Sequence, residues 1–430
     1  MIQKILDLHI HSKYSRACSK DLELEKIAFA CELRGIDIVS TGDFTHPKWF
    51  ESIKNELIED TEGVYKLKKS ESKTRFVIGT EVASIKKHKD KTRRVHHLIF
   101  APNIEMAEKF NVYLNTRGFN LRSDGRPILG LTSKEILQIM LEIDSRMVMI
   151  PAHAWTPWFG IFGSKGGYNT LEEAYDELTP HVNAIETGLS SDPLMNWRLS
   201  MLDNITLISN SDAHSPQKLG REANIMQFEN EEEITYAEIM RIIREGDKKK
   251  FVSTIEFYPE EGKYHFDGHA LCQFSCTPEE TKKIRGLCPK CKKPLVIGVM
   301  NRIDELADRD EKTAQALGHI PYRSIVPLPE IIADVFGVGV ASKAVQKQYE
   351  SLLHSLGSEF FILLTVSKEK IEQVSSKEIA NAIERVRTGN IFVRPGYDGV
   401  FGVVKVFGEN EKKSPRRMVS PRAEKRIILT

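Results

Sequence analysis

The chain lacks long hydrophobic runs and carries almost no net charge. No stretch approaches the roughly 20 consecutive apolar residues that a membrane-spanning helix needs, and the first residues read into a strand without a targeting signal. We therefore expect a cytoplasmic protein with no membrane partner. A net charge of +1 does not mark a nucleic-acid-binding protein, although neutrality over a whole chain can hide a local basic face.

Two local basic runs interrupt this neutrality. Lys248, Lys249 and Lys250 stand near an expected domain boundary, and a tail that begins at Lys412 is rich in lysine and arginine. A solvated linker or terminus and a phosphate-binding segment explain either run about equally well.

Cysteine is scarce, and its distribution is uneven. Four of the six cysteines fall within twenty residues, at Cys272, Cys276, Cys288 and Cys291. The spacings Cys-x3-Cys and Cys-x2-Cys are typical of two knuckles that close a tetrahedral zinc site. Two disulfides are the alternative, but they fit a cytoplasmic chain poorly. Because four thiolates leave no open coordination position, the predicted zinc is structural rather than catalytic.

The sequence does contain a repeated alternation of strand and helix patterns. Its length, with 41% hydrophobic and 28% charged residues, describes a globular protein of two or three domains. Apolar strands are expected at 5–10, 36–40, 75–79, 95–101, 147–150, 184–187 and 205–209, and helices at 22–34, 132–143 and 236–245. Such alternation implies parallel strands wrapped by helices, as an α/β barrel or a layered sheet.

Side chains that bind metals follow several of these strands. Imidazole and carboxylate are usual ligands of hydrolytic divalent metals, and histidines two positions apart on a strand face the same way. One such residue alone is more often a cap or turn residue, but the set suffices for two or three ions that activate water beside a phosphate. The candidate ligands are His9, His11, Asp43, Glu81, His97, His153, Asp212 and His214. Glu81 is suited to bridge two cations, because a carboxylate has two oxygens.

In their order along the chain, these motifs resemble those of the PHP (polymerase and histidinol phosphatase) superfamily of metal-dependent phosphoesterases. The matching motifs are His9-x-His11, Thr41-Gly42-Asp43, Gly79-Thr80-Glu81, His97-Leu98-Ile99, Pro151-Ala152-His153 and Ser211-Asp212-Ala213-His214. The Leu-Ile pair favours His97 over its neighbour His96 as the ligand. Many members carry an acid shortly after the first motif, where this chain reads Tyr14-Ser15-Arg16.

The resemblance implies a distorted seven-stranded β/α barrel over residues 1–250 with a trinuclear metal site. Two or three divalent ions are therefore expected, and zinc, manganese, magnesium and iron are all candidates.

With its four-cysteine segment and a C-terminal helical segment, the chain is similar to the endonuclease Q family of DNA repair nucleases. The implied domains are a phosphoesterase at 1–250, a four-cysteine zinc-binding module at 251–300 and a mainly helical C-terminal domain at 301–430. The resemblance implies damaged DNA as the partner. It also implies metal-activated hydrolysis of the phosphodiester 5′ of a deaminated base (uracil, hypoxanthine or xanthine) or of an abasic site. We find no sliding-clamp peptide, so a clamp partner has no support in the residues.

The same resemblance suggests that an acid in the loop after Glu186 takes part in catalysis, and Asp192 is the candidate. An Asp before a Pro is also a common turn starter, so a purely structural role is the alternative.

An aromatic and glycine-rich loop follows His153. Its rings are Trp155, Trp158, Phe159 and Tyr168. Aromatic rings suit a base that has been extruded from the stack, and backbone amides of the loop could donate to the carbonyl of a deaminated base. For each ring, a packed cover over the barrel mouth is the alternative.

Residues 328–341 and their continuation read as a helix, a glycine hairpin and a second helix. Amides of the hairpin at Gly337 and Gly339, together with Lys343, would receive a backbone phosphate. An ordinary helical turn is the alternative.

Two other functions compete with a DNA repair nuclease. A small-molecule phosphatase of the histidinol phosphate type would have nearly the same site, but it has no use for the long segment after residue 250. A non-catalytic DNA-binding protein with a degenerate barrel would be expected to have lost several of the ligands.

Overall fold

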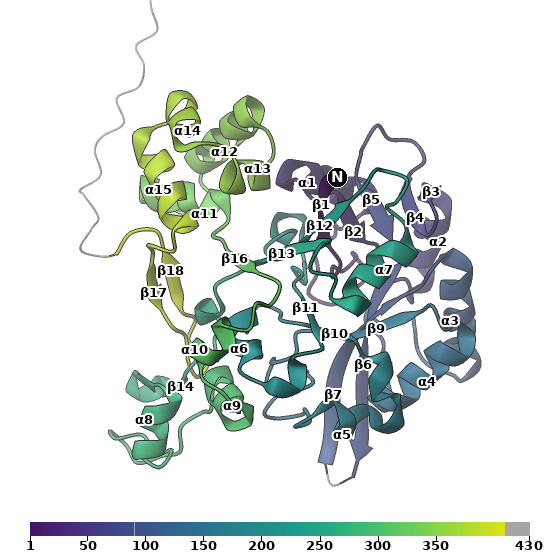
Figure 1. Cartoon of the computed structure of the whole chain (residues 1–430), viewed down its shortest axis with the longest axis horizontal. Coiled ribbons are helices and arrows are strands. Elements are labelled where there is room, and N and C mark those ends of the chain that lie inside the picture. The colour runs from purple at the N-terminus through teal and green to yellow at the C-terminus, as the bar shows by residue number, and fades with distance from the viewer. Residues whose placement is uncertain (90, 409–430) are drawn as a thin grey trace, which may run out of the picture.

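Eight strands form the largest sheet of the computed structural model, which describes residues 1–89 and 91–408 (Figure 1). Their order is β16-β13-β12-β1-β2-β5-β4-β3, with β1 parallel to β2 and antiparallel to β12. The bounds are β1 (Ile2–Asp7), β2 (Ile38–Ser40), β3 (Leu57–Thr61), β4 (Val64–Leu67), β5 (Arg75–Val77), β12 (Ala223–Phe228), β13 (Phe251–Glu256) and β16 (Tyr322–Ser324).

A second sheet has four strands in the order β8-β6-β7-β9 and contains a long hairpin. The hairpin of β6 and β7 reaches past the neighbouring helices at the bottom of Figure 1. A separate parallel pair is formed by β10 and β11. The bounds are β6 (Gly79–His88), β7 (Lys91–Phe100), β8 (Ile128–Leu129), β9 (Val148–Pro151), β10 (Ala184–Glu186) and β11 (Thr206–Ile208).

Helices separate many of these strands along the chain, although β3 to β7 follow one another with no helix between them. They are α1 (Leu24–Arg34), α2 (Pro47–Glu56), α3 (Ile104–Thr116), α4 (Ser133–Ile143), α5 (Leu171–Tyr175), α6 (Pro193–Trp197) and α7 (Tyr236–Glu245). Helix α4 begins where predicted, because Thr132 and Glu135 form a reciprocal capping box. Helix α7 begins after its cap Thr235 and ends at Gly246, whose left-handed backbone (φ 56°) closes the last turn.

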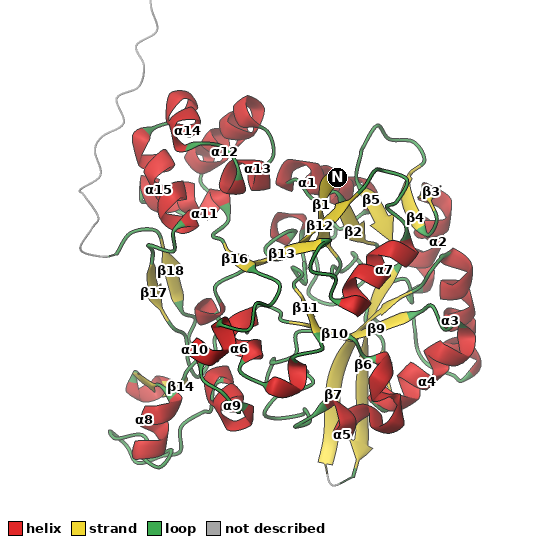
Figure 2. Cartoon of the chain, viewed as in Figure 1, coloured by secondary structure: helices red, strands yellow, loops and turns green. Residues whose placement is uncertain are grey.

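The predicted mixed α/β fold with a helical C-terminal region is confirmed (Figure 2). The hydrogen-bonded strands form separate sheets, and the seven-stranded barrel stays a prediction. The divisions at residues 250 and 300 also stay predictions. The large sheet crosses the first of them, because β13 pairs with β12 and β16 pairs with β13.

A small module follows β13. It contains β14 (Asp267–His269), β15 (Phe274–Cys276), α8 (Pro278–Lys283), α9 (Val299–Leu306) and α10 (Glu311–Gln315). The C-terminal region then contains α11 (Leu328–Phe336), α12 (Lys343–Leu356), α13 (Glu359–Leu364), α14 (Lys368–Val374), α15 (Lys377–Arg387), β17 (Phe392–Arg394) and β18 (Val403–Lys405). Short 3-10 turns are η1 (Asp176–His181), η2 (Ser200–Leu202), η3 (Pro216–Lys218), η4 (Pro259–Glu261) and η5 (Ala270–Cys272).

A buried carboxylate joins the C-terminal helices to the first part of the chain. Glu359, which is 1% exposed, accepts from the Arg34 guanidinium at 2.6 Å and from the Tyr349 hydroxyl at 2.8 Å. Its other oxygen accepts from the Leu328 amide at 2.8 Å. Arg34 ends α1, so this contact fixes the helical region against the α/β part of the molecule.

Two of the lysines in the run at 248–250 have partners in the structure. Lys250 pairs with Glu233 and Glu238, and Lys248 donates to the Gly318 carbonyl at 2.9 Å. The basic tail from Lys412 lies outside the described residues. Among residues 1–89 and 91–408, no helix is long and apolar enough to span a bilayer.

Candidate metal centre

Two predicted motifs that lie some two hundred residues apart in the sequence meet beside β1 and β11. The His11 amide donates to the Ala213 carbonyl at 3.1 Å, and Ile10 forms a parallel bridge with Ala213. His9, His11 and Asp212 thereby come together, with ligand atoms that lie within 4.8 Å of one another. Asp212 Oδ1 lies 3.1 Å from His11 Nε2 and 3.6 Å from His9 Nε2. These three side chains could hold one divalent ion.

A second group of ligand atoms is formed by Glu81, His96 and His153, also within 4.8 Å of one another. Glu81 Oε1 lies 2.8 Å from His96 Nδ1 and 3.0 Å from His153 Nε2. Its other oxygen, Oε2, lies 3.3 Å from His11 Nε2 and 3.7 Å from His9 Nε2. Glu81 therefore stands between the two groups with one oxygen toward each, as a bridging ligand would.

The structure brings His96 into this cluster, and not the predicted His97. Successive side chains of a strand point to opposite faces, and the face of β7 with His96 is the one toward Glu81. His97 points the other way, where its Nε2 lies 3.0 Å from Ser133 Oγ and its Nδ1 lies 3.4 Å from the Tyr175 hydroxyl. The assignment of the candidate ligand therefore moves from His97 to His96.

The remaining predicted ligands, Asp43 and His214, lie beside the first group. Asp43 Oδ1 lies 3.1 Å from His11 Nδ1, and its Oδ2 accepts from the Ser12 amide and from the Ser12 and Ser15 hydroxyls. Ser15 belongs to the segment in which the family's usual acid is missing. His214 lies at the edge of the cluster, with its ring centroid 4.7 Å from that of His11. Asp43 is therefore placed to orient His11.

Sequence reasoning missed a positioning residue, Glu186. This fully buried carboxylate lies 3.1 Å from His9 Nδ1 and accepts from the His153 amide at 2.7 Å and from Asn210 Nδ2 at 2.8 Å. A carboxylate on one imidazole nitrogen leaves the other nitrogen for a metal, which is the usual outer-shell arrangement in metalloproteins. His9 Nε2 is buried without a hydrogen-bond partner among the described residues, so the residues present fit a bound cation. The only sequence signal was an acid at the end of an apolar strand.

Three of the candidate ligands hold strained backbone conformations. Asp43, His153 and Asp212 have φ values of 47°, 31° and 46°, in the left-handed region that non-glycine residues rarely adopt. Such strain typically concentrates at functional sites, where the surrounding structure imposes it.

The cluster is strongly charged. Arg126 Nη1 lies 2.9 Å from Glu81 Oε2. Burial alone would raise the pKa of Glu81, but the charges of His96, Arg126 and His9 lower it well below its usual range. The charge of His9 and the contacts with His11 likewise lower the pKa of Asp212 against the effect of burial. Both carboxylates are therefore ionised and attract cations.

Asp192 caps helix α6, and its Oδ1 accepts from the Met195 amide at 2.8 Å. Burial raises the pKa of Asp192 to about 7, with the charges of Glu260 and Glu311 adding to the effect. Its neighbour Glu256 has a pKa that burial raises to about 8. Asp192 can therefore both cap helix α6 and donate a proton near neutral pH.

The four rings of the predicted aromatic loop divide into two pairs. Trp155 and Tyr168 are buried, with the Trp155 indole donating to Asn196 Oδ1 and the Tyr168 ring packed on Arg93. Trp158 is 50% exposed. Phe159 stacks on His96 with ring centroids 4.5 Å apart, so it borders the metal cluster. Only Trp158 and Phe159 are placed to meet a ligand.

In the cysteine-rich module, the structure groups His269 with three of the four predicted cysteines. The ligand atoms of His269, Cys272, Cys288 and Cys291 lie within 4.8 Å of one another. Cys276 lies outside this group, with its sulfur 3.2 Å from Thr281 Oγ1. One imidazole and three cysteine sulfurs form a group of four possible ligands, of the residue types that zinc binds.

The predicted helix, hairpin and helix are present as α11 and α12. Gly337, with φ 66°, ends α11, and Ser342 caps α12. Among the described residues, no atom beyond the chain neighbours lies within 4 Å of a Cβ position at Gly337 or Gly339, so both glycines face open space. Lys343, the first residue of α12, is exposed.

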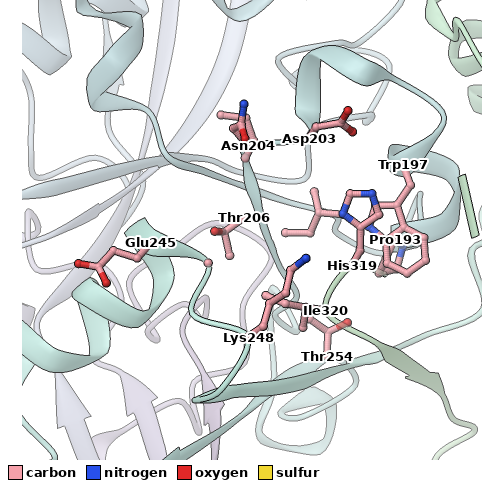
Figure 3. A pocket seen from close by; sticks show the side chains of 13 residues that line it. Pro193, Trp197, Asp203, Asn204, Thr206, Glu245, Lys248, Thr254, His319 and Ile320 are labelled. Atoms are coloured by element: carbon pink, nitrogen blue, oxygen red, sulfur yellow. The ribbon is translucent and has the colours of Figure 1, made fainter. Parts of the chain in front are cut away.

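A separate pocket of about 410 Å³ lies away from this cluster (Figure 3). It reaches Thr206, at the start of β11, whereas Asp212 follows the end of that strand. The Trp197 and His319 rings, which stack with centroids 5.0 Å apart, line it together with Lys248. This pocket therefore belongs to the opposite end of the strand from the metal centre.

The class that this arrangement defines is that of the metal-dependent phosphoesterases. The lesion-specific endonuclease PfuEndoQ from Pyrococcus furiosus is 32% identical, over 96% of this chain and 98% of that protein, with a TM-score of 0.83. The chain belongs to the endonuclease Q family. A structure of endonuclease Q with a 27-mer duplex substrate carrying an abasic lesion at the active site is also 32% identical, over 97% and 100% of the two chains, with a TM-score of 0.82.

Other relatives match part or most of the chain. YqxK of Bacillus subtilis, an uncharacterized protein, is 26% identical over 93% of this chain and 98% of its own length. MJ0043 of Methanocaldococcus jannaschii, also uncharacterized, is 29% identical over 63% of this chain, and the match spans only about a third (34%) of MJ0043. Residues 327–390, which contain α11 to α15, match the family model of the MJ0043 C-terminal domain.

Proposed function

We propose that this chain is a DNA repair endonuclease that hydrolyses the phosphodiester 5′ of a deaminated base or an abasic site. The observation that carries the proposal is the cluster around Glu81, in a chain that matches a lesion-specific endonuclease over almost its whole length. The abasic duplex bound by endonuclease Q supports DNA as the substrate.

Two groups of residues would hold the catalytic ions: His9, His11 and Asp212 on one side, and His96 and His153 on the other, with Glu81 between them. Divalent ions bound there supply an activated water and neutralise charge on the phosphate. Glu186 and Asp43 orient His9 and His11, respectively, so that the ring nitrogen of each that faces the cluster is held in place.

Arg126 would bind the phosphate that is cleaved. Its side chain is 25% exposed and its guanidinium already lies at Glu81, so it can donate to a non-bridging oxygen of a phosphate at the cluster. Such a donor stabilises the negative charge that develops on the phosphoryl oxygens in the transition state.

Asp192 would serve as the general acid. Attack of water on phosphorus breaks the bond from phosphorus to the 3′ oxygen of the preceding nucleotide, and that oxygen needs a proton to leave as a hydroxyl. A carboxyl with a pKa of about 7 is protonated in half of the molecules at neutral pH and can supply it.

The exposed side of the aromatic loop would hold the damaged nucleotide. Phe159 borders the metal cluster through His96, and Trp158 is the exposed ring next to it. An aromatic face suits an extruded nucleotide whatever its base, and nearby backbone amides can donate to the carbonyl of a deaminated base. Trp155 and Tyr168 would support the loop from inside.

The cysteine-rich module would bind one structural zinc through His269, Cys272, Cys288 and Cys291. With all four positions filled by side chains, such a zinc has no open position for catalysis and acts by holding β14, the turn after it and the knuckle at 288–291 together.

The test is nicking of an end-labelled duplex that contains one deoxyuridine, with manganese or magnesium added. We expect a single nick 5′ of the uracil, abolished in His9→Ala and in Asp212→Asn and retained in His97→Gln as the matched control. Release of phosphate from small monoesters without any nick would refute the proposal, since it would indicate a small-molecule phosphatase.

A further inference from the structure

The face of the β6–β7 hairpin that carries Glu81 continues outward from the metal centre as a basic surface. The register pairs Glu81 with Leu98, Ala83 with His96, Ile85 with Arg94, and Lys87 with Thr92. Because directly paired residues share a face and alternate pairs return to it, these four pairs lie on one side of the hairpin. The strand face with Glu81 and His96 therefore presents Arg94 and then Lys87 farther out.

Within the part of the chain that the structure describes, no acidic side chain pairs with the two cations of this face. Lys87 is exposed and Arg94 is partly buried, and neither side chain has an ion-pair partner in residues 1–89 and 91–408. On the opposite face, by contrast, Lys86 is paired with Glu135 at 2.7 Å. As far as residues 1–89 and 91–408 show, the side of the hairpin that leads to the metal centre thus keeps two cations without an acidic partner.

The loop after His153 adds a further cation beside this face. The Arg94 amide donates to the Gly166 carbonyl at 3.0 Å, and the His96 amide donates to the Phe159 carbonyl at 2.9 Å, so the loop runs along the edge of β7. This places the exposed Lys165 next to Arg94. We call Lys87, Arg94 and Lys165 the arm surface.

We propose that the arm surface binds the phosphate backbone of the duplex that flanks the lesion. The proposal rests on the proposed function. Lys87 lies six positions along β6 from Glu81, which at about 3.4 Å per residue is about 20 Å of strand. With a rise of about 3.4 Å per base pair, the arm surface would reach backbone about six base pairs from the cleaved phosphate.

The test measures how salt weakens binding to a fluorescent duplex with one abasic analogue, in calcium so that binding is followed without cleavage. Each phosphate that a cation neutralises adds about 0.9 to the slope of log Kd against log salt concentration. Lys87→Gln/Lys165→Gln should therefore lower that slope by about 1.8. The control Lys69→Gln/Lys73→Gln removes two exposed lysines of the β4–β5 loop and should leave the slope unchanged.

A second measurement locates the contact. Duplexes cut back to about four base pairs on one side of the lesion remove the backbone that the arm surface would reach. On one of the two shortened duplexes, the wild type and the double variant should bind with the same slope. An unchanged slope in the double variant, or a difference that persists with both shortened duplexes, would overturn the proposal.

A cleavage assay distinguishes failure of the arm-surface proposal from failure of the proposed function. With saturating enzyme in manganese, the double variant should nick the deoxyuridine duplex at the wild-type single-turnover rate, because the arm surface does not touch the reacting atoms. Absence of nicking in the wild type would refute the proposed function. A normal nick with an unchanged salt slope would refute only the arm surface.

Discussion

Glu186 offers the sharpest test of how the metal centre is held together. Its two oxygens accept from three donors, namely His9 Nδ1, the His153 amide and Asn210 Nδ2. In Glu186→Gln one oxygen becomes an amide nitrogen that faces N–H donors, so at least one of these contacts becomes repulsive. We expect His9 to turn away from its metal-binding orientation.

The expected magnitude follows from the place of Glu186 behind a candidate ligand. Loss of such a partner typically lowers metal affinity by about 10- to 100-fold, which corresponds to about 1.4 to 2.8 kcal/mol. Competition of the protein with a fluorescent chelator, at a series of manganese or zinc concentrations, measures this change directly.

The control is Glu256→Gln. Glu256 is also a buried strand-end carboxyl, but it accepts from Thr187, Ser209 and Thr254 rather than from a candidate ligand. Wild-type metal affinity in Glu186→Gln, at an unchanged thermal midpoint, would refute the positioning role. An equal loss of affinity in both variants would show that the effect is general destabilisation.

Three further predictions concern residues whose role the structure and the sequence indicate differently. His96→Gln should lower the amount of bound divalent metal per chain and abolish nicking, whereas His97→Gln should keep the metal, as measured by elemental analysis after dialysis; the reverse result would restore His97 as the ligand. Asp192→Asn should slow cleavage by about 10²- to 10⁴-fold. Because Asp192 donates when protonated and its pKa is raised to about 7, the wild-type cleavage rate should fall as the pH rises through 7. The variant should not show this fall in rate. A wild-type rate that stays level from pH 6 to 9 would contradict the general acid. His269→Ala should release the structural zinc and lower the thermal midpoint, whereas Cys276→Ser should retain one zinc per chain. Loss of zinc from Cys276→Ser would instead support a site with four cysteine ligands.

Most of the metal centre could be predicted because most of its ligands follow strands whose ends meet, although Glu81 lies near the start of β6. His9, His11, Glu81, His153 and Asp212 all lie in the two groups of the structure. The choice between His96 and His97 could not be made in the same way. Two adjacent histidines occupy opposite faces of one strand, and only the register of β7 against β6 and β9 decides which face meets the other ligands.

For related reasons, the sequence could not show which side chains group together in the zinc module or which aromatic rings of the loop are exposed. Cysteine spacing cannot show how β14 pairs with β15. That pairing puts Cys276 opposite Asp267, with its sulfur near Thr281. His269 instead lies close to the other three cysteines. In the loop after His153, no periodicity separates buried rings from exposed ones. Trp155 became a core residue because Asn196, forty-one positions later, satisfies its indole.

The contact of Glu359 with Arg34 constrains how this chain can change over time. The carboxylate is almost fully buried, and a buried charge that loses its partner costs about 3 to 5 kcal/mol, a large part of a domain's stability. A substitution at Arg34 would thus be tolerated only with a matching change at Glu359, 325 positions away. The catalytic part and the helical part should therefore be inherited as one unit, with coupled substitutions across their junction rather than independent exchange of either part.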